Sequence, residues 1–463
     1  MTTTEPPAPG TPAPGTAARG TAARGTAARE PATRQGYLPT APYRGTRDFL
    51  PDEMSVREQV FGSLHRCVEQ FGYQRYDGPL LESAEIYEAK SGQEIAGQQL
   101  YSLTDRGGRR LAIRPEMTPS AARIIAGHAG ELQFPVRWYC NVNCHRYERP
   151  QRGRTREHWQ VNVDIFGSDS PNCELEMFEV VHAMLASVGA TRDMYELRAN
   201  DRVLLNSLLT DVIGVSREQL RPVASILDRW AKYPRPELLA AAQQAGLSER
   251  QFSQLEESLL AGGELLALLP AEVVAASALA GILASDDRDL VTFSPLIVRG
   301  FEYYTATVFE VFDTDPANPR SLFGGGRYDD LTSLFSSQRI PGIGFAMGDV
   351  TIMDFLETHN LLPAPQAGAQ IVVLPVDAGL RAAARGIAAQ LRAAGYRVTV
   401  PLEPRKLGTE LRRAAQSGAA VAVIIGPEEW LRGEVTVRDL RTREQLGAPR
   451  GQLPSAVRAL LAG

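Results

Sequence analysis

Cysteine and long apolar runs are scarce in this sequence, and this scarcity excludes two classes of protein. Four cysteines occur among 463 residues, too few and too irregularly spaced for a disulfide framework. No uninterrupted run of about 18 apolar residues is present, and no positively charged segment followed by an apolar stretch begins the sequence. We therefore expect neither a disulfide-stabilised secreted domain nor a membrane protein, but a cytoplasmic one.

Cys140 and Cys144, with His145 next to the second cysteine, raise the alternative of a metal site; the other two cysteines are Cys67 and Cys173. Structural zinc sites usually take four ligands from two such pairs, and no second pair follows at a suitable spacing. We favour buried structural thiols and expect no protein-bound metal.

The other proportions are those of an ordinary globular protein of about two to four domains, with 44% hydrophobic and 22% charged residues. The net charge of -5 is unevenly distributed. From Gln370 to the end, 14 Lys and Arg stand against 8 Asp and Glu, a net of +6, so the remainder carries -11. A basic C-terminal region attracts phosphate backbones, although arginines scattered over solvated helix faces would give the same count.

Residues 1–37 have almost no apolar bulk and contain Gly-Thr-Ala-Ala-Arg three times between Gly15 and Arg29. Such a segment cannot offset its ordering entropy, so we expect a disordered, dispensable tail. Its arginines would also fit an organellar transit peptide or weak contact with RNA, but serine is absent and the only apolar side chains are small.

A folded domain is predicted over residues 38–362. Val56, Val60, Leu64 and Val68 recur at four-residue steps and predict an amphipathic helix, and residues 205–290 are rich in helix-forming residues. Residues 363–369 have the Pro and Gly content of a linker, and 370–463 alternate strand and helix, which predicts a small α/β domain.

The stretch from Leu296 to Asp329 organises the first domain. Its β-branched and aromatic residues predict strands that place Arg299, Glu302 and Tyr304 on a sheet. The later Gly324-Gly-Gly allows either a close backbone approach to a ligand or a tight turn.

The segment from Leu111 to Thr118 begins as a strand and ends with Glu116 and Thr118 just beyond a proline. A carboxylate and a hydroxyl together suit the donors of an ammonium group. The alternative is that both residues only cap a helix that begins at Pro119.

A hairpin with a cationic loop is predicted between Val136 and Gly167. The loop holds five arginines, Arg146, Arg149, Arg152, Arg154 and Arg156. One guanidinium group can bind two phosphate oxygens at once, so the loop suits a triphosphate. A solvated surface hairpin without a ligand would have the same sequence pattern. On the returning strand Gln160 and Asp164 share a face because they are four residues apart.

Taken together, these segments resemble the histidyl-tRNA synthetase family of class II. The resemblance rests on Arg44-Gly-Thr-Arg-Asp-Phe-Leu-Pro, on Arg299 to Tyr304, on Arg146 two residues before Glu148, and on Pro341 to Ile352. It implies an α+β catalytic domain with an antiparallel sheet, a helical insertion that helps to grip tRNA, and a C-terminal α/β domain of the anticodon-binding type.

The resemblance also implies roles for single residues. Arg299 and Arg146 would be catalytic and face the reacting phosphate. ATP would be bound by Arg146, Glu148, Arg154, Arg299 and Arg327. Histidine would be bound by Glu116, Thr118, Gln160, Asp164, Tyr303 and Tyr304, with the first three on its amino group and Asp164 on its imidazole. Gln151 and Arg152 would approach the tRNA acceptor stem.

One position departs from the family pattern. An arginine that contacts the ATP γ-phosphate usually stands three residues after the last glycine of the third class II motif, where this sequence has Thr351 after Gly348. Either another arginine serves the phosphate, as in a similar branch of the family, or the chain is a paralogue without ATP chemistry. Asp349 is most simply a helix N-cap.

The function implied is activation of histidine by ATP, with Mg²⁺, and transfer of histidine to tRNA(His) by a homodimer without membrane contact. The alternatives are a histidine-sensing regulatory subunit of histidine biosynthesis and an amino-acid-activating enzyme with another acceptor. Arg299 and the basic C-terminal region argue against the regulator, which usually lacks both.

Overall fold

The computed structural model describes residues 38–89, 95–227, 229–230, 233–286, 288–298, 303–403 and 405–462. The predicted disordered tail at 1–37 and the predicted catalytic residue Arg299 therefore lie outside the described residues. The chain divides into two units, Met1–Tyr43 and Arg44–Gly463.

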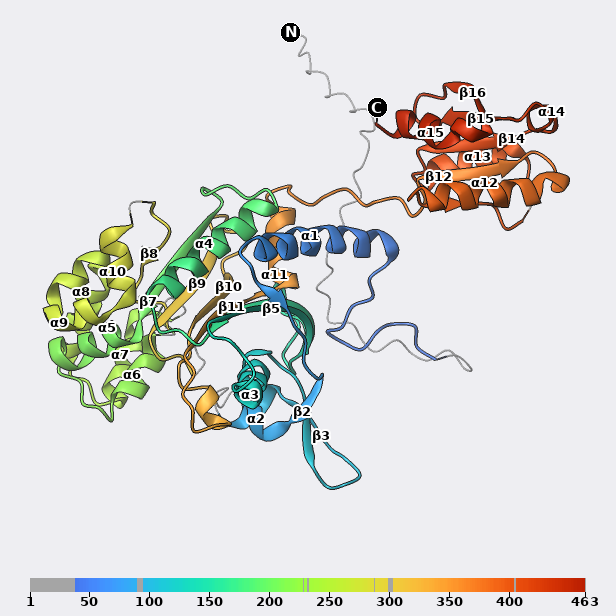
Figure 1. Ribbon diagram of the computed structural model, residues 1–463. Helices are drawn as coiled ribbons and strands as arrows, with labels where there is room; N and C mark the ends of the chain where they lie inside the picture. The colour runs from blue at the N-terminus through green and yellow to red at the C-terminus, as the bar shows by residue number, and fades with distance from the viewer. Residues whose placement is uncertain are drawn as a thin grey trace, which may run out of the picture. The chain divides into compact units, whose positions relative to one another are not determined.

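An eight-stranded sheet forms the centre of the first domain (Figure 1). Its strands, in spatial order, are β1 (Gln74–Arg75), β5 (Val136–His145), β6 (Glu157–Phe166), β11 (Gly342–Gly348), β10 (Ser321–Arg327), β9 (Thr307–Asp313), β7 (Tyr195–Asp201) and β8 (Thr292–Phe293). The six strands from β5 to β7 are antiparallel, and only the outer pairs β1–β5 and β7–β8 are parallel. The predicted antiparallel sheet is confirmed.

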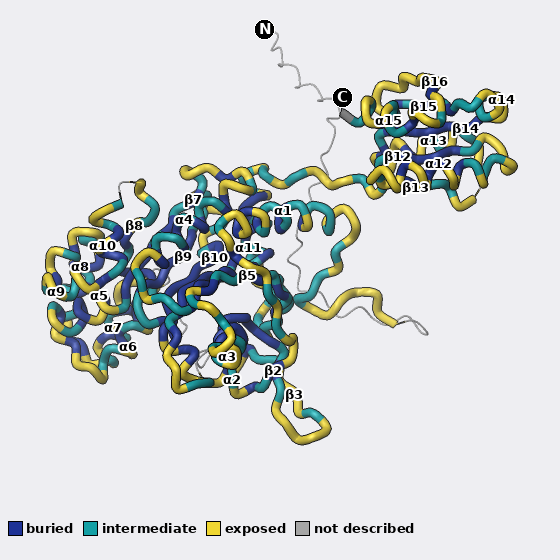
Figure 2. Tube along the Cα trace, viewed as in Figure 1, coloured by how far each residue is buried: buried dark blue, intermediate teal, exposed yellow. Residues whose placement is uncertain are grey.

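Long helices cover one face of this sheet: α1 (Pro51–Gln70), α4 (Asn172–Ser187) and α11 (Asp349–Thr358). Successive side chains of a strand point to opposite faces. On β6, Val161, Val163 and Ile165 pack into the apolar core with α1 and α4. The polar side chains between them are therefore presented to the opposite face. Figure 2 shows the strands of the sheet as buried.

Smaller elements accompany that opposite face. They are α2 (Ala84–Glu88), the π-helix η1 (Ile95–Gln99), α3 (Thr118–His128), the 3₁₀ turn η4 (Thr332–Leu334), and a three-stranded sheet of β2 (Leu81–Ser83), β4 (Arg110–Ile113) and β3 (Tyr101–Thr104). Ala121, Ala122 and Ile125 of α3 pack against Tyr303, Tyr304 and Tyr328 in a second apolar cluster. The three tyrosines of this cluster also border the candidate site.

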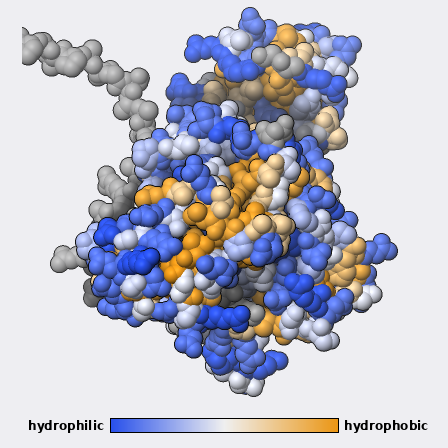
Figure 3. Space-filling model, turned by 90° about the vertical axis from the view of Figure 1, so that its left-hand side faces the viewer, coloured by the Kyte–Doolittle hydropathy of each residue, from blue (hydrophilic) through white to orange (hydrophobic). Residues whose placement is uncertain are grey.

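A helical region follows β7. It comprises α5 (Arg202–Ser207), η2 (Leu208–Val212), α6 (Leu220–Leu227), α7 (Arg235–Gln244), α8 (Glu249–Leu260), η3 (Gly262–Leu268), α9 (Ala271–Ala276) and α10 (Ala278–Ser285). Its buried apolar side chains continue the main core. Figure 3 faces this side of the molecule and shows orange apolar residues among blue hydrophilic ones.

The C-terminal domain has its own five-stranded sheet, in the order β13 (Val398–Thr399), β12 (Ile371–Pro375), β14 (Val421–Ile425), β15 (Glu434–Asp439) and β16 (Gln445–Pro449). Helices α12 (Arg381–Ala393) and α15 (Leu453–Ala462) share one apolar core with this sheet, while α13 (Leu407–Gln416) packs in the other. The remaining elements are η5 (Ala378–Leu380), α14 (Pro427–Leu431) and η6 (Arg450–Gln452). The predicted α/β domain is present.

The expectation that Tyr304 lies on a strand is wrong, because β9 begins only at Thr307. The preceding backbone has other partners: the side-chain amide of Asn200 donates to the carbonyls of Pro295 and Ile297, and the Thr305 amide donates to the Arg327 carbonyl at 2.7 Å.

Among the helices of the described ranges, none is long and apolar enough to cross a membrane.

Candidate active site

Asp164 lies at the centre of the site on the face of β6 opposite α1. It is 1% exposed, and one carboxylate oxygen accepts a hydrogen bond from the Tyr328 hydroxyl. Its Oδ2 is buried and has no hydrogen-bond partner among the described residues. Burial raises the pKa of Asp164 to about 7, although the bond from Tyr328 opposes the rise. A buried carboxylate with an unoccupied oxygen is suited to a ligand N–H.

Glycines let the backbone of the neighbouring strands approach this carboxylate. A Cβ atom on Gly344 of β11 would lie 2.2 Å from Asp164 Oδ1 and 2.8 Å from the Tyr328 hydroxyl. A Cβ atom on Gly326 of β10 would lie 2.8 Å from the Tyr304 ring. The Gly324-Gly-Gly run is therefore part of a strand and not a tight turn, while the other expectation, a close backbone approach to a ligand, stays a prediction.

Three tyrosines form an aromatic wall beside Asp164. The ring centroids of Tyr303 and Tyr304 are 4.9 Å apart, and those of Tyr303 and Tyr328 are 6.0 Å apart. The Tyr303 hydroxyl donates to Glu116 Oε2 at 2.9 Å. The wall thus joins the two carboxylates, since Tyr328 binds Asp164 while Tyr303 binds Glu116.

The other predicted histidine-binding residues belong to the same region. Thr118 is the first residue of α3 and is 8% exposed, and α3 has no side-chain cap, so the capping alternative for Glu116 and Thr118 is wrong. Gln160 lies on the same face of β6 as Asp164, and its amide nitrogen donates to Asn162 Oδ1 at 2.8 Å. The predicted common face of Gln160 and Asp164 is confirmed.

Arg146 borders this region just beyond the end of β5. Its Nε donates to the carbonyl of Pro115 at 2.9 Å, which ties it to the backbone beside Glu116. The predicted ATP residues Glu148 and Arg154 face each other, with Arg154 Nη1 3.6 Å from Glu148 Oε2. These three charged groups belong to the loop between β5 and β6, as the hairpin prediction required.

The tip of the loop is exposed and makes few contacts. Gln151 and Arg154 exchange backbone hydrogen bonds of 2.9 Å, and the Gln151 side chain accepts one from Arg320 at 3.1 Å. Arg152 is exposed, and its charge lowers the pKa of Asp354, which burial raises overall. The two residues predicted to approach tRNA are therefore on an accessible surface.

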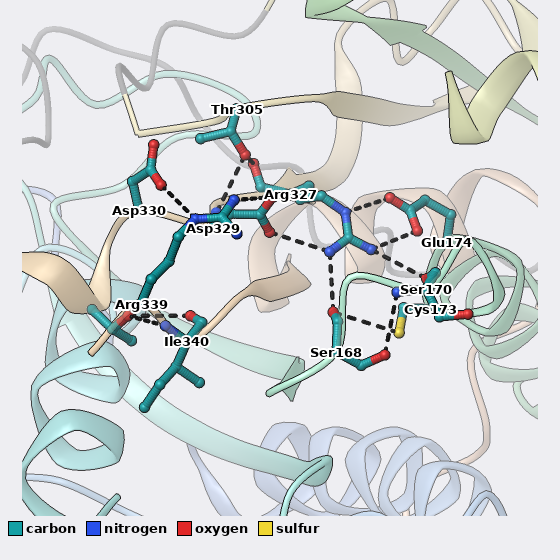
Figure 4. A network of polar contacts seen from close by, with 11 residues as sticks. Ser168, Ser170, Cys173, Glu174, Thr305, Arg327, Asp329, Asp330, Arg339 and Ile340 are labelled. Atoms are coloured by element: carbon teal, nitrogen blue, oxygen red, sulfur yellow. Dashed lines mark hydrogen bonds and ion pairs between the residues drawn. The ribbon is translucent and has the colours of Figure 1, made fainter. Parts of the chain in front are cut away.

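Arg327 has a different environment from the other predicted ATP residues (Figure 4). Its Nε and Nη2 donate to the buried carboxylate of Glu174 at 2.5 and 2.6 Å, and its Nη1 donates to Asp329 and to the Ser168 carbonyl at 3.2 Å each. Every nitrogen of this guanidinium has a protein partner. Contact with ATP would require the network to open, so the arrangement favours a structural role for Arg327.

Asp349 is the first residue of α11 and not its N-cap, which is Gly348, so the N-cap expectation is wrong. Its carboxylate is 1% exposed and accepts hydrogen bonds from Arg47 Nη2 at 2.7 Å and from the Trp159 amide at 3.0 Å. Arg57 Nε lies 3.8 Å away. Sequence reasoning missed this cluster because Arg47 and Asp349 are 302 positions apart and each fits a local explanation.

The four cysteines are reduced and buried. Cys140 and Cys144 pack with Met117 and Val142 in a small apolar cluster under the site. Burial raises the pKa of Cys144 to about 12, so its thiol is neutral at physiological pH.

An antiparallel sheet with a buried polar face, and an arginine-rich hairpin beside it, define the catalytic domain of a class II aminoacyl-tRNA synthetase. The model of the histidyl-tRNA synthetase family matches residues 45–351, and that of an anticodon-binding domain matches residues 370–460. The chain belongs to the histidyl-tRNA synthetase family.

Curated relatives match along most of the chain. A histidine–tRNA ligase of Leptospira biflexa is 39% identical over 416 residues, which is 88% of this chain and 95% of that protein. One from Opitutus terrae is 36% identical, covering 89% of this chain and 97% of its own length.

Solved structures have the same fold. A histidyl-tRNA synthetase from Nostoc sp. PCC 7120 aligns with a TM-score of 0.78 at 22% identity, over 91% of this chain and the whole of that one. A protein from Bacillus halodurans is described as an ATP phosphoribosyltransferase regulatory subunit/histidyl-tRNA synthetase. It aligns with a TM-score of 0.68 at 23% identity, over 81% of this chain and 97% of that one.

Proposed function

We propose that this protein is a histidine–tRNA ligase, which activates histidine with ATP and transfers it to the 3′ end of tRNA(His). The observation that carries the proposal is the joint match of a histidyl-tRNA synthetase domain and an anticodon-binding domain along one chain. Curated relatives of that name share 36 to 39% identity over nearly their whole length.

The site provides complementary groups for histidine. The unoccupied oxygen of Asp164 accepts an imidazole N–H, and Glu116, Thr118 and Gln160 surround the amino group. The tyrosine wall and the carboxylates beside it are buried, and a hydrogen bond made away from water is electrostatically stronger. Tyr303 orients Glu116 through its 2.9 Å hydrogen bond.

Histidine so held places its carboxylate toward the arginine-rich hairpin. The carboxylate attacks the α-phosphorus of ATP in line, and the bond to the departing pyrophosphate breaks as the bond to histidine forms. Arg146 stabilises the charge that develops on the phosphoryl oxygens, and Arg299 has the same role by resemblance to the family. Such catalysis depends on positioning and charge stabilisation.

Mg²⁺ enters as part of the MgATP substrate in this proposal. The described ranges contain no cluster of three His, Cys, Asp or Glu side chains that would hold a metal alone. At nucleotide sites magnesium usually takes its ligands from phosphate oxygens, water and one or two carboxylates.

In the second step the ribose hydroxyl of the tRNA end attacks the carbonyl carbon of histidyl-adenylate, and AMP leaves. The exposed loop tip with Gln151 and Arg152 suits contact with the acceptor stem, and the net charge of +6 beyond Gln370 suits the anticodon region. The homodimeric state, expected from the family, and the cytoplasmic location, expected from the lack of long apolar runs, remain predictions.

A regulatory subunit is the second candidate, and the resemblance to the Bacillus halodurans structure is the reason to keep it. It would bind histidine in the same pocket but would neither activate it nor need a tRNA-binding domain. The match of residues 370–460 to an anticodon-binding domain favours the ligase.

Histidine-dependent exchange of pyrophosphate into ATP, followed by charging of tRNA, tests the proposal. The ligase shows both activities. Histidine binding without exchange would instead identify a regulator, and exchange without charging would identify an enzyme with another acceptor. Arg299→Ala is expected to abolish exchange while the protein stays folded, and unchanged exchange would contradict the role given to Arg299.

A further inference from the structure

The position at which related enzymes carry an arginine holds no cation here. The Thr351 hydroxyl donates to the carbonyl of Leu322 at 2.5 Å and contacts that of Gly348 at 3.3 Å, so this side chain is fixed to the backbone. Its methyl carbon faces the hairpin loop, 3.8 Å from where a Cβ atom on Gly153 would lie. The loop and the start of α11 are thus neighbours, and a cation that replaced the missing arginine would have to lie near them.

Two arginines from the N-terminal segment gather at the start of α11. Arg47 and Arg57 share the carboxylate of Asp349, while Glu58 and Glu157 also act on Arg57, and Asp354 lies within the field of Arg47. Buried nitrogens are left over as well, because Arg47 Nε and Arg57 Nε and Nη2 have no hydrogen-bond partner among the described residues. A cluster of guanidinium groups with unused donors is suited to an anion.

The two arginines differ in their access to a ligand. The Arg57 side chain is 7% exposed, and its guanidinium lies 4.5 Å from the Trp159 ring centroid and 5.0 Å from that of Phe61, on the α1 face of the sheet. The Arg47 side chain is 30% exposed, and within the described ranges its guanidinium lies over one aromatic ring, that of Phe49 at 4.9 Å. Arg57 is therefore an internal support, whereas Arg47 can reach a ligand.

The segment that carries Arg47 lies against the returning arm of the hairpin, where the Arg156 carbonyl accepts the Arg146 amide at 2.8 Å. The carbonyl of Gly45 accepts the amides of Arg156 and Glu157 at 2.8 and 3.1 Å, which fixes this segment along the hairpin. The pKa of His158 is lowered to about 3, mainly by burial and in part by the charges of Arg146 and Arg47. The charges of Arg47 and of Arg152 in the loop both act to lower the pKa of Asp354.

We propose that Arg47 is a phosphate-binding residue of the MgATP site, held by Asp349 so that its guanidinium replaces the arginine absent at Thr351. Its ligand is the β,γ end of the triphosphate, the part that leaves as pyrophosphate. Arg146 faces the reacting phosphate, and Arg47 holds the leaving group. This inference rests on the proposed function, and Asp349 is a positioning residue within it.

Pyrophosphate exchange measured without tRNA tests this role, because the phosphates of tRNA are then absent and cannot be the ligand of Arg47. Arg47→Ala is expected to raise the KM for ATP and for pyrophosphate by about tenfold or more, the usual effect of removing a charged hydrogen-bond donor, while the KM for histidine changes less than about twofold. Arg47→Lys keeps the charge but loses the planar fork, so an intermediate effect is expected. Arg66→Ala removes an exposed arginine of α1 and is the matched control.

The measured pattern separates three outcomes. If the unmodified protein exchanges and Arg47→Ala leaves the KM values for ATP and pyrophosphate unchanged, or raises all three KM values alike, Arg47 does not bind the phosphate and the inference is overturned. A defect confined to tRNA charging would assign Arg47 to the phosphates of tRNA and would also overturn it. If the unmodified protein shows no exchange, the proposed function itself fails.

Discussion

The hydroxyl of Tyr303 donates a 2.9 Å hydrogen bond to the carboxylate of Glu116, a residue 187 positions earlier in the chain. Both side chains are buried, at 3% exposure each. This bond connects the segment after β8 to the segment before α3, and so fixes a carboxylate at the predicted site of the histidine amino group.

Tyr303→Phe is expected to weaken histidine binding more than ATP binding. The change removes a hydrogen bond to a charged group, worth about 1.5–3 kcal/mol, and leaves the aromatic wall in place. The expected result is a rise of about tenfold in the KM for histidine in pyrophosphate exchange. Tyr233→Phe, on an exposed ring of the helical region, is the control. An unaltered KM for histidine would show that Glu116 does not depend on Tyr303.

Asp164 predicts a particular dependence of stability on pH. Its pKa rises from 3.8 to about 7 on folding because the carboxyl is buried, so the folded protein holds a proton that the unfolded chain releases. The contribution of Asp164 to the free energy of unfolding is fully present below about pH 4 and is lost as the pH rises through about 7.

Asp164→Asn removes this titration but keeps an acceptor for Tyr328. Without histidine, the melting temperature of the variant relative to the unmodified protein is therefore expected to increase between about pH 5 and about pH 8. Thermal unfolding of both proteins over that range measures the difference, in which the effects of all other groups cancel. A difference that does not change with pH would contradict the raised pKa.

The face of β6 shows what the sequence predicts well. A period of two residues separates Val161 and Val163 from Gln160 and Asp164, so local spacing alone assigned the two polar residues to one face. The hairpin, the amphipathic helix α1 and the alternating C-terminal domain have equally local signals. The secondary structure of these elements follows from the local sequence pattern and depends little on residues far away in the chain.

The errors concern residues whose partners lie far away in the chain. Tyr304 has strand-forming neighbours, but Asn200 and Arg327 hold the backbone before β9 in another conformation. The sequence suggested Asp349 as a helix cap, yet it is the first residue of α11, and its carboxylate pairs with Arg47 and Arg57. No spacing rule connects such positions, because the sheet brings them together only after it has formed.

Gly344→Ala is expected to disturb the site through sterics. The new methyl group would lie 2.2 Å from Asp164 Oδ1 and 2.5 Å from the backbone oxygen of Val163, so the carboxylate and the strand must both move. Such overpacking costs about 1–3 kcal/mol of unfolding free energy, and it also displaces the predicted imidazole acceptor. Calorimetric titration with histidine is expected to show affinity reduced by at least about tenfold.

Gly447→Ala is the matched control for this change. Gly447 is also a strand glycine, in β16, but no atom lies within 4 Å of the position its Cβ would take. We expect histidine affinity to be unchanged. Equal affinities for the Gly344 variant and the unmodified protein would mean that the pocket does not require the close approach of β11.

The ion pair between Arg327 and Glu174 distinguishes a structural arginine from an ATP-binding one. The guanidinium is 5% exposed and the carboxylate 1%, so removing one partner leaves a buried charge uncompensated. Glu174→Gln is expected to lower the unfolding free energy by about 3–5 kcal/mol. Arg339→Met, which breaks a half-exposed pair with Asp329 and Asp330, is expected to cost about 1 kcal/mol or less.

The double variant Glu174→Leu/Arg327→Met decides between the two roles, because replacing a buried ion pair by apolar side chains of similar size often restores stability. If Arg327 is structural, as its contacts with Glu174 and Ser168 indicate, the double variant regains much of the lost unfolding free energy and keeps its KM for ATP. Chemical denaturation and pyrophosphate exchange measure the two quantities separately. A stable double variant with a KM for ATP raised about tenfold or more, and an unchanged KM for histidine, would instead assign Arg327 to the nucleotide.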